Sequence, residues 1–473
     1  MNSMNEPQSD YAEFNRRDFL RGGSLATLMT MLGGVQLVAQ PAPEKEGEKK
    51  EKVKVKVAII GLNNRGRDIL DELGALKRDE KLTVDPEVAA ICDNYPIMMT
   101  RAAKKVPEAT KVADYKALLE NKDIQAVIIA TPTHEHKDIA LAALKAGKHV
   151  YCEAPLANTL EDARAIALAA KEAVGQVFQP GLQMRSDPER LFLLPFIRSG
   201  ALGKLVMARA QWHKKQSWRS TSPSEDREKA LNWRLAKDTS LGLAGEIGIH
   251  QLDQAAWFLN KMPTAVSGNG ATILWDDGRE VPDTVHLSFE FPGRVRFSFD
   301  ATLANSFDGE HEIYYGSDAA VMIRQSKDLE NDKGTKAWMF KEVDSPLLGW
   351  EVYARKDAFY AETGIALVVG GSKQTAMNDK GAAQSPFPFA PLYYALGNFL
   401  GNCVEVNQAV QDIKETYPNI DKAALAQQLA EIKLRDAATY KEGYAATVLA
   451  IKANEAVTQR QRIELKKEMF ELP

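Results

Sequence analysis

Residues 55–66 read Val-Lys-Val-Ala-Ile-Ile-Gly-Leu-Asn-Asn-Arg-Gly, and this stretch decides the fold. An apolar, β-branched run ends at Gly61, a short turn closes at Gly66, and a helix-like pattern follows. Free N–H groups and the helix dipole at such a helix start make a site for an anion, for example a dinucleotide pyrophosphate. Gly61 permits the sharp turn and Gly66 permits close packing of helix on strand, whereas Asn63 replaces the usual middle glycine. By itself the turn fits a plain strand–turn–helix equally well.

The next strand favours the dinucleotide interpretation. Residues 87–93 read Glu-Val-Ala-Ala-Ile-Cys-Asp, so the strand ends in an acid where ribose hydroxyls need an acceptor. Asp93 lies 32 positions after Gly61, against roughly 20 in the general pattern. The charged stretch at residues 77–86 accounts for the longer spacing, because it can form an extended connection between the predicted helix at residues 67–76 and the strand at residues 87–93. Asp93 would accept the ribose hydroxyls of NAD and repel the 2′-phosphate of NADP; the alternative is an unrelated surface aspartate.

Strand and helix patterns alternate through residues 54–175, which we take as the first domain. Strand-like runs occupy residues 55–60, 87–93, 126–132 and 148–153, and helix-like runs occupy residues 67–76, 98–106, 115–120, 137–146 and 160–174. Repeated strand–helix units predict a parallel, doubly wound sheet, with ligand at the carboxyl ends of the strands. The residues expected at those ends are Gly61, Asp93, Thr131, Pro132, His134, Glu153 and Pro155.

The pattern changes in residues 176–473, which form the predicted second domain. Strands are expected at residues 206–212, 265–273, 284–291, 295–301 and 313–315, and helices at residues 191–199, 246–259, 392–405, 422–433 and 443–465. Several strands alternate apolar and polar residues, as in His286-Leu-Ser-Phe-Glu-Phe291, which is typical of an antiparallel sheet with one solvated face. The expected fold class is therefore α/β, with a parallel sheet followed by a large, mostly antiparallel one.

The N-terminus resembles a targeting segment. Residues 1–40 contain Asn15-Arg-Arg-Asp-Phe-Leu-Arg21 followed by a mildly apolar run too short for a comfortable membrane span. This pattern is similar to a twin-arginine export signal, which implies a folded, exported and periplasmic protein with no stable membrane span after signal removal. A chance Arg-Arg pair before a core helix is the alternative. Residues 41–53 are charged and read as a solvated linker.

Composition narrows the classes of function. The chain has 473 residues, enough for two domains, and a net charge of -4 without a basic block, which argues against a nucleic-acid partner. Its three cysteines, Cys92, Cys152 and Cys403, show neither metal-ligand nor disulfide spacing. We therefore predict no metal site.

Many short motifs in a fixed order resemble the glucose–fructose oxidoreductase/inositol dehydrogenase (Gfo/Idh/MocA) family. They are the turn at residues 61–66, Ala130-Thr-Pro-Thr-His-Glu-His136, residues 140–155 (Ala-Leu-Ala-Ala-Leu-Lys-Ala-Gly-Lys-His-Val-Tyr-Cys-Glu-Ala-Pro), Gly181-Leu-Gln-Met-Arg185, Ser199-Gly-Ala-Leu-Gly203, Asn232-Trp-Arg234 and Glu246-Ile-Gly-Ile-His-Gln-Leu-Asp253. The resemblance implies an N-terminal Rossmann domain for NAD or NADP, tightly bound in several exported members. It also implies a C-terminal α/β domain whose open sheet serves substrate and oligomer contacts, hence a homo-oligomer. Substrates are mostly sugars, polyols or derivatives, oxidised at a secondary alcohol.

One position departs from the family pattern. The lysine of the family's E-K-P motif, which holds the substrate hydroxyl and acts as acid and base, is Ala154 here, and the surrounding sequence aligns without a gap. Three readings follow: an exported NAD(P)-dependent oxidoreductase with another proton carrier; a redox-type, NAD-dependent glycoside hydrolase with tightly bound cofactor; or a non-catalytic member that binds a nucleotide or sugar.

His250 is the leading candidate for that proton carrier, because an imidazole can titrate near neutral pH. Glu246 precedes it by four positions, on the same face of an α-helix, and occupies the place of the family's usual Asp. It would orient or charge-stabilise the imidazole. A helix-capping glutamate beside a satisfied histidine is the alternative.

The cofactor-binding and substrate-binding residues complete the predicted site. For the cofactor these are Gly61, Asn63, Asn64, Arg65, Gly66, Asp93, Thr131, Pro132, His134, His136, Glu153 and Pro155. The resemblance places the loop with His134 and His136 under the nicotinamide side, and Glu153 at the nicotinamide ribose. For the substrate we expect Arg185, Trp233, Arg234 and Lys214. A structural ion pair for Arg185 and a solvated loop for Lys214 are the alternatives.

Overall fold

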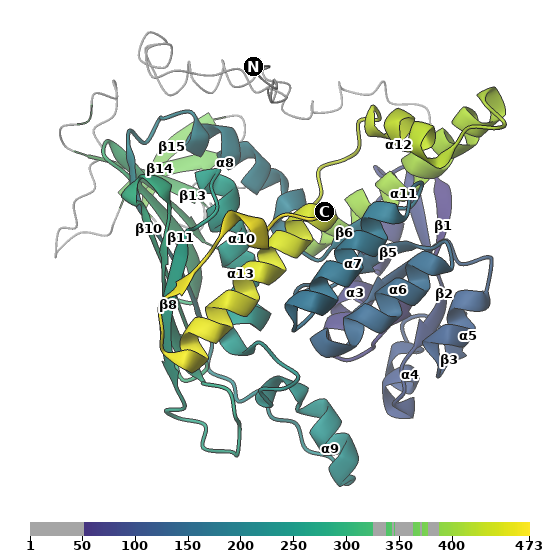
Figure 1. The fold of residues 1–473 in the computed structure, drawn as a ribbon, viewed down its shortest axis with the longest axis horizontal. Helices are drawn as coiled ribbons and strands as arrows, with labels where there is room; N and C mark the ends of the chain where they lie inside the picture. The colour runs from purple at the N-terminus through teal and green to yellow at the C-terminus, as the bar shows by residue number, and fades with distance from the viewer. Residues whose placement is uncertain (1–51, 325–336, 343–344, 346–362, 369–370, 377–386) are drawn as a thin grey trace. The chain divides into compact units, whose positions relative to one another are not determined.

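The computed structural model describes residues 52–324, 337–342, 345, 363–368, 371–376 and 387–473 (Figure 1). The predicted signal segment, and the predicted linker up to residue 51, lie outside these residues. The described chain divides into two compact units. One comprises residues 52–191, 208–312 and 387–473, and the other comprises residues 192–207 and the described part of 313–386. Every residue of the predicted site belongs to the first unit.

A six-stranded parallel sheet lies in the first unit, in the order β3-β2-β1-β4-β5-β6. Its strands are β1 (Val53–Ile60), β2 (Val84–Cys92), β3 (Thr110–Val112), β4 (Ala126–Ile129), β5 (His149–Cys152) and β6 (Phe178–Pro180). The helices between them are α3 (Asn64–Arg78), α4 (Pro96–Ala102), α5 (Tyr115–Glu120), α6 (His136–Lys145) and α7 (Leu160–Glu172). This is the doubly wound Rossmann order, and it confirms the predicted parallel sheet.

Apolar runs form the centre of this sheet because both of its faces are covered. Every residue of β4 and β5 is buried, as expected for strands between two helix layers. Helix α11 (Pro391–Thr416) covers one face, where Phe399 meets the Tyr151 ring at 5.7 Å between centroids. Helix α13 (Tyr440–Gln459) adds Tyr444 to the core on the other face. The hydrophobic core of the N-terminal domain therefore extends past residue 175, to β6 and to the last helices of the chain.

The second sheet has ten strands in the described residues, in the order β15-β14-β13-β12-β11-β7-β10-β9-β8-β16. They are β7 (Leu205–His213), β8 (Ala265–Ala271), β9 (Thr284–Glu290), β10 (Arg296–Thr302), β11 (Glu310–Gly316), β12 (Ala319–Arg324), β13 (Ala337–Lys341), β14 (Thr363–Val368), β15 (Gly371–Ala376) and β16 (Ile463–Glu464). The pairs within β8–β10 and within β12–β15 are antiparallel. Buried and exposed residues alternate along β9, as its sequence predicts.

Two helices, α13 and α10 (Ile249–Leu259), cover one face of strands β8 to β10. Helix α13 lies on β8, since a Cβ built on Gly268 or Gly270 would come within 3.0 Å of Val457. Gly248, just before α10, packs equally closely on Phe299 of β10. Figure 1 shows α10 and α13 side by side against these strands. The remaining helices are α8 (Pro188–Arg198), α9 (Glu225–Leu231) and α12 (Lys422–Ala430).

Several predicted helices differ from those observed; the helix predicted over residues 392–405, for example, extends to Thr416 in α11. The helix predicted over residues 443–465 ends at Gln459, because Arg460 adopts a left-handed conformation and Ile463–Glu464 pairs with β8 as β16. The helix predicted over residues 246–259 begins with a π-helical turn, Leu243–Ile247, before α10. A π turn bonds residue i to i+5, so the spacing rules of an α-helix fail there.

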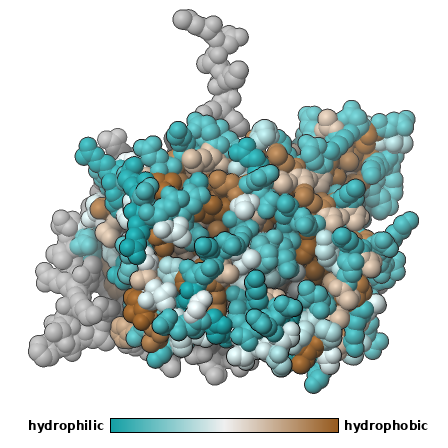
Figure 2. All heavy atoms as spheres, turned by 60° about the horizontal axis from the view of Figure 1, so that its bottom comes forward, coloured by the Kyte–Doolittle hydropathy of each residue, from teal (hydrophilic) through white to brown (hydrophobic). Residues whose placement is uncertain are grey.

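None of the described helices combines the length and apolarity needed to cross a membrane. The face of the molecule in Figure 2 carries small apolar areas divided by hydrophilic side chains. Two loop residues of the C-terminal domain, Ile273 and Phe307, are exposed by 70% and 83%. Scattered apolar side chains of this kind are normal on a protein surface.

Candidate functional site

The turn after β1 leaves no room for side chains at its two glycines. Gly61 has φ 92°, and a Cβ there would lie 2.6 Å from the Ala130 carbonyl oxygen; one on Gly66 would lie 2.1 Å from the Gly61 oxygen. Gly61 also donates its N–H to the Cys92 carbonyl at 2.9 Å. The ends of β1, β2 and β4 thus meet at the turn, which is the switch point of a doubly wound sheet.

Asn63, which replaces the middle glycine of the fingerprint, is the N-cap of α3. Its Oδ1 accepts the Asn64 N–H at 2.9 Å. The next two N–H groups, of Arg65 and Gly66, have no acceptor among the described residues. Asn63 and Asn64 are exposed. The turn therefore presents two free backbone donors at a helix N-terminus, as a pyrophosphate requires.

Asp93 braces the same turn from the end of β2. Its Oδ2 accepts the Leu62 N–H at 2.8 Å and its Oδ1 accepts the Tyr95 N–H at 2.8 Å. A carboxylate has about four lone-pair sites, so each oxygen keeps one for a ribose hydroxyl. The predicted ribose acceptor is thus also part of the scaffold that shapes the phosphate turn.

Arg65 and Glu153 form an ion pair across the switch point. Arg65 Nε donates to Glu153 Oε1 at 2.9 Å, and Arg65 Nη2 donates to Gln183 Oε1 at 2.8 Å. Burial alone would lower the pKa of Arg65, but the charge of Glu153 raises it above the usual value. The pair links the turn after β1 to the ends of β5 and β6. Sequence reasoning missed Gln183, although it lies inside the Gly181–Arg185 motif.

Glu246 bonds to residues other than His250. Its Oε2 accepts from Thr133 Oγ1 at 2.9 Å and its Oε1 accepts the Leu241 N–H at 3.1 Å. Burial raises the pKa of Glu246, and the charge of Arg234 opposes that shift. The α-helical spacing of four residues does not apply to Glu246 and His250, because Glu246 lies inside the π turn and His250 lies in α10. Thr133 was not foreseen, and no sequence signal singled it out.

Two imidazoles of the site each have a buried nitrogen without a hydrogen-bond partner among the described residues. Nδ1 of His250 and of His134 are enclosed without a hydrogen-bond partner among the described residues. Burial, followed by the charge of Arg65, lowers the pKa of His250 to about 4. The His250 ring is half-buried and only its Nδ1 is enclosed, so Nε2 keeps access to solvent. Burial also lowers the pKa of His134, whose ring lies 6.1 Å from Trp233.

His136 ties two loops together. Its Nδ1 lies 3.0 Å from the Pro155 carbonyl oxygen and its Nε2 lies 2.9 Å from that of Thr131. The side chain is 1% exposed, and burial lowers its pKa to about 4. His136 therefore fixes the loops after β4 and β5, whereas the neighbouring Thr131 Oγ1 is buried without a partner and remains free for a ligand.

Arg234 lies beside two tryptophan rings. Its guanidinium carbon is 4.7 Å from the Trp233 ring and 5.8 Å from the Trp218 ring. Desolvation by the surrounding protein lowers the pKa of Arg234, yet the side chain remains exposed to solvent and has no acceptor among the described residues. The charges of Glu246, Arg65 and Glu153 all act on it. A solvent-accessible guanidinium without an acceptor among the described residues is suited to binding a polar ligand.

The other two predicted substrate residues lie differently. Arg185 donates from Nε and Nη2 to both oxygens of Asp253, at 2.9 and 2.8 Å, and stacks on Trp257 at 5.1 Å. The ion pair with Asp253, which was the alternative interpretation of Arg185, therefore occupies both of these donors. Lys214 is exposed at the end of β7, and no described contact joins its side chain to Arg234 or to the two tryptophans beside it.

Ala154 packs into an apolar cluster with Leu182, Leu241 and Ile249. Its methyl group cannot carry a proton. Other acid–base groups of the predicted site include His250, on which the charge of Arg65 acts, and Glu246, on which the charge of Arg234 acts.

The residues present fit a nicotinamide dinucleotide. Unpaired donors at Arg65 and Gly66 suit the pyrophosphate, and Asp93 suits the adenosine ribose. Thr131 Oγ1 follows β4 without a hydrogen-bond partner among the described residues, and the charge of Arg65, a residue of the phosphate turn, acts on the half-buried His250.

Known proteins share this architecture. The family model described as "Oxidoreductase family, NAD-binding Rossmann fold" matches residues 55–181, and that of the "GFO/IDH/MocA C-terminal domain" matches residues 195–321. A levoglucosan dehydrogenase of Pseudarthrobacter phenanthrenivorans is 31% identical over 177 residues, or 37% of this chain and 43% of that protein. An inositol 2-dehydrogenase of Salmonella typhimurium is 31% identical over 204 residues, covering 43% and 54%. A glycosyl hydrolase family 109 protein of Stenotrophomonas maltophilia is 36% identical over 164 residues, covering 32% and 34%.

The chain thus spans about half the length, or less, of these relatives. Among solved structures, a levoglucosan dehydrogenase in complex with NADH and L-sorbose aligns with a TM-score of 0.63 at 19% identity, covering 88% of this chain and 99% of that one. That likeness establishes the fold. The two family models match both halves of the described fold, and the parallel sheet with its phosphate turn fits the NAD-binding model. This chain therefore belongs to the Gfo/Idh/MocA oxidoreductase family and carries that family's NAD-binding Rossmann domain.

Proposed function

We propose that this protein is an NAD-dependent oxidoreductase that interconverts a secondary alcohol and a ketone on a sugar, a polyol or a derivative. The observation that carries the proposal is the half-buried His250, whose Nε2 keeps access to solvent without a hydrogen bond among the described residues, and whose pKa is lowered first by burial and then by the charge of Arg65. Arg65 in turn belongs to the phosphate turn and bonds to Glu153. A free base therefore lies close to the NAD-binding switch point, as alcohol oxidation requires.

The proton moves through His250 in this account. When bound, NAD supplies the hydride acceptor. Nε2 of His250 takes the proton of the substrate hydroxyl, and it returns the proton when the ketone is reduced. Arg234, unpaired between two tryptophans, holds a polar group of a ligand, and the indole rings suit the apolar face of a sugar. Thr133 and the Leu241 N–H fix Glu246, which keeps an acidic group next to Arg234.

A sugar and polyol panel tests this activity. The purified protein is incubated with NAD and each of several cyclic polyols, pyranoses and anhydrosugars, and NADH formation is followed by absorbance. We expect NADH with at least one secondary alcohol, and its loss in His250→Ala. If no member of a broad panel reacts although NADH binds, the protein is a non-catalytic binder of the kind suggested by Ala154.

Redox-type glycoside hydrolysis is a second candidate function. The similarity to a glycosyl hydrolase family 109 protein supports it. Such an enzyme needs no added cofactor, because the sugar is oxidised and then reduced again within one turnover. Aryl glycosides incubated with the protein and no added nicotinamide separate the two candidates. Release of the aglycone without net NADH would favour the hydrolase.

We further propose that the protein is exported by the twin-arginine route. The support is the Arg16-Arg17 pair with the Phe-Leu that follows and the mildly apolar run after it. Residues 1–40 fused to a folded reporter should direct it to the periplasm. The double change Arg16→Lys and Arg17→Lys should retain the reporter in the cytoplasm, and equal export of both fusions would refute the proposal.

A further inference from the structure

A segment that follows β7 contacts the residues directly after Asp93 at the end of β2. Residues 214–232 leave the end of β7, include α9, and return to Trp233. We name them the clasp. Its base is attached to the loop after β8, its tip contacts the residues that follow β2, and the two attachments differ in strength.

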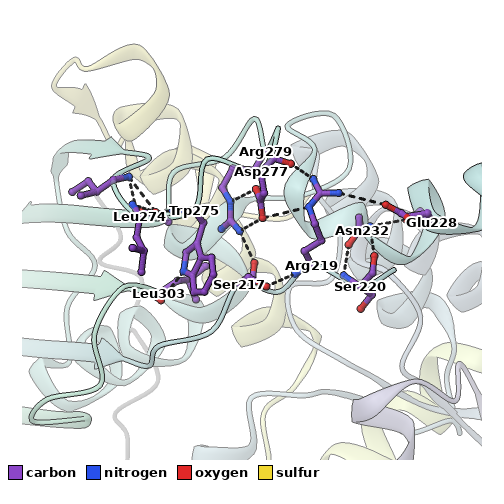
Figure 3. A network of polar contacts seen from close by, with 12 residues as sticks. Ser217, Arg219, Ser220, Glu228, Asn232, Leu274, Trp275, Asp277, Arg279 and Leu303 are labelled. Carbon is purple, nitrogen blue, oxygen red and sulfur yellow. Dashed lines mark hydrogen bonds and ion pairs between the residues drawn. The ribbon is translucent and has the colours of Figure 1, made fainter. Parts of the chain in front are cut away.

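The base of the clasp is held by a buried arginine (Figure 3). The side chain of Arg279 is 0% exposed and donates to both carboxylate oxygens of Asp277, at 2.8 and 2.7 Å, and to the Ser217 carbonyl at 2.6 Å. Arg219 of the clasp forms an ion pair with Asp277 at 3.4 Å and with Glu228 at 3.7 Å. Several charge-assisted bonds around one buried cation make a rigid attachment.

The two ends of the clasp are also tied to each other. Asn232 accepts the Ser220 N–H at 2.8 Å and donates to the Ser220 carbonyl at 2.8 Å (Figure 3). The Ser222 N–H donates to Glu228 Oε2 at 3.0 Å, which joins the first part of the segment to α9. The clasp is therefore a loop closed by its own internal bonds.

The tip of the clasp is Arg227 on α9. Its Nη1 donates to Asn94 Oδ1 at 3.1 Å, and its guanidinium carbon lies 3.9 Å from the centre of the Tyr95 ring. Asn94 and Tyr95 directly follow Asp93, the ribose acceptor. Burial and then Asp93 raise the pKa of Glu135, whereas the charge of Arg227 lowers it. Arg227 thus lies near both the end of β2 and the loop after β4, which flank the adenosine in a Rossmann domain.

We propose that the clasp holds the adenosine half of NAD in place and that it opens at the tip to release the cofactor. The tip has one hydrogen bond and one cation–π contact on partly exposed groups, so it breaks more easily than the base. Nε of Arg227 is buried and has no acceptor among the described residues, so no bond of this group helps to hold the tip closed. Arg227 is a positioning residue in this account, since it touches neither the substrate nor the reacting atoms. The proposal depends on NAD binding and not on the reaction.

The release rate of NADH tests the clasp. Wild-type protein loaded with NADH is mixed with excess NAD, and the loss of nicotinamide fluorescence gives the dissociation rate. Arg227→Ala should raise this rate by about tenfold, the factor that corresponds to roughly 1.4 kcal/mol. Lys229→Ala is the matched control, because Lys229 is an exposed cation on the same helix and no contact of its side chain is described. It should leave the rate unchanged.

A truncated cofactor shows which half of NADH is held. Reduced nicotinamide mononucleotide lacks the adenosine, so its affinity should be equal in wild-type protein and Arg227→Ala. Tyr95→Leu should accelerate NADH release in the same direction as Arg227→Ala. Equal NADH release from wild-type protein and Arg227→Ala, slower release from the variant, or an equal effect on the mononucleotide would overturn the clasp. Failure of NADH to bind at all would instead contradict the cofactor site, and bound NADH without turnover would contradict only the proposed activity.

Discussion

Arg65 Nε and Glu153 Oε1 lie 2.9 Å apart and join the phosphate turn to the end of β5. Arg65→Met leaves the almost buried Glu153 without its cation. The arginine side chain is 30% exposed, so solvent reduces the cost, and we expect a loss of about 1–3 kcal/mol in the free energy of unfolding. The affinity for NADH should fall as well, because the turn loses its link to β5 and β6.

Arg67→Met is the control for this prediction. Arg67 is on the same turn of α3, and among the described residues its side chain hydrogen-bonds to Asn64 alone. Urea unfolding and NADH titration of both variants measure the effect. Equal stability and affinity of Arg65→Met and Arg67→Met would show that the ion pair has no structural role.

Asp93 should set the preference for NAD over NADP. Asp93→Ser removes the charge that repels a 2′-phosphate, so the ratio of the two dissociation constants should move toward NADP by tenfold or more, an effect of about 1.4 kcal/mol. NAD should itself bind more weakly, because the variant loses acceptors for the Leu62 and Tyr95 N–H groups. Asp93→Asn keeps one acceptor oxygen for these bonds and separates the two effects. Unchanged discrimination in Asp93→Ser would remove the assignment.

His250 should give the pH profile an unusually low acidic limb. Its pKa is lowered to about 4, chiefly by burial, so the imidazole stays neutral and able to accept a proton well below the usual 6.5. The rate kcat/KM for alcohol oxidation should therefore fall only as the pH approaches about 4 to 5. His250→Ala should reduce kcat by about 100-fold or more, the usual contribution of general base catalysis, with a smaller change in KM. An acidic limb near 6.5 that persists in His250→Ala would assign the proton to another group.

His136 should make the fold sensitive to mild acid. Its pKa is about 4 in the folded state because it is buried, whereas an unfolded chain titrates near 6.5. The unfolded state therefore takes up a proton first, so this stability is present above pH 6.5 and is lost as the pH falls toward 4. The full shift corresponds to about 3 kcal/mol. Urea unfolding at a series of pH values measures it. His136→Gln should be less stable at pH 7 but should lose less stability between pH 7 and pH 5.

The sequence predicted those parts of the fold that depend on local pattern. Strands such as residues 126–129 lie between two helix layers and read as continuous apolar runs, so they were placed correctly. The helix predicted to residue 465 was too long, because the amphipathic pattern continues past the left-handed Arg460. The π turn at residues 243–247 leaves no signal in residue spacing, and the predicted contact between Glu246 and His250 depended on an α-helix there.

Contacts between residues far apart in the chain could not be predicted from the sequence. Arg65 and Glu153 are 88 positions apart, and Arg227 and Asn94 are 133 apart. Neither pair has a spacing rule, since each depends on how strands and loops meet in three dimensions. Asn63 is a different case: it was noted as a deviation from the glycine fingerprint, and the structure explains it as the N-cap of α3. The C-terminal helices α11 and α13 likewise cover the parallel sheet although they follow the second sheet in the chain.

A crystal structure of the protein with NADH and a sugar that it reduces or binds tests the central claim most directly. We predict that pyrophosphate oxygens accept the N–H groups of Arg65 and Gly66, and that His250 Nε2 lies within hydrogen-bond distance of a secondary hydroxyl of the sugar. A dinucleotide bound away from this turn, or a His250 ring that faces away from the sugar, would contradict the account.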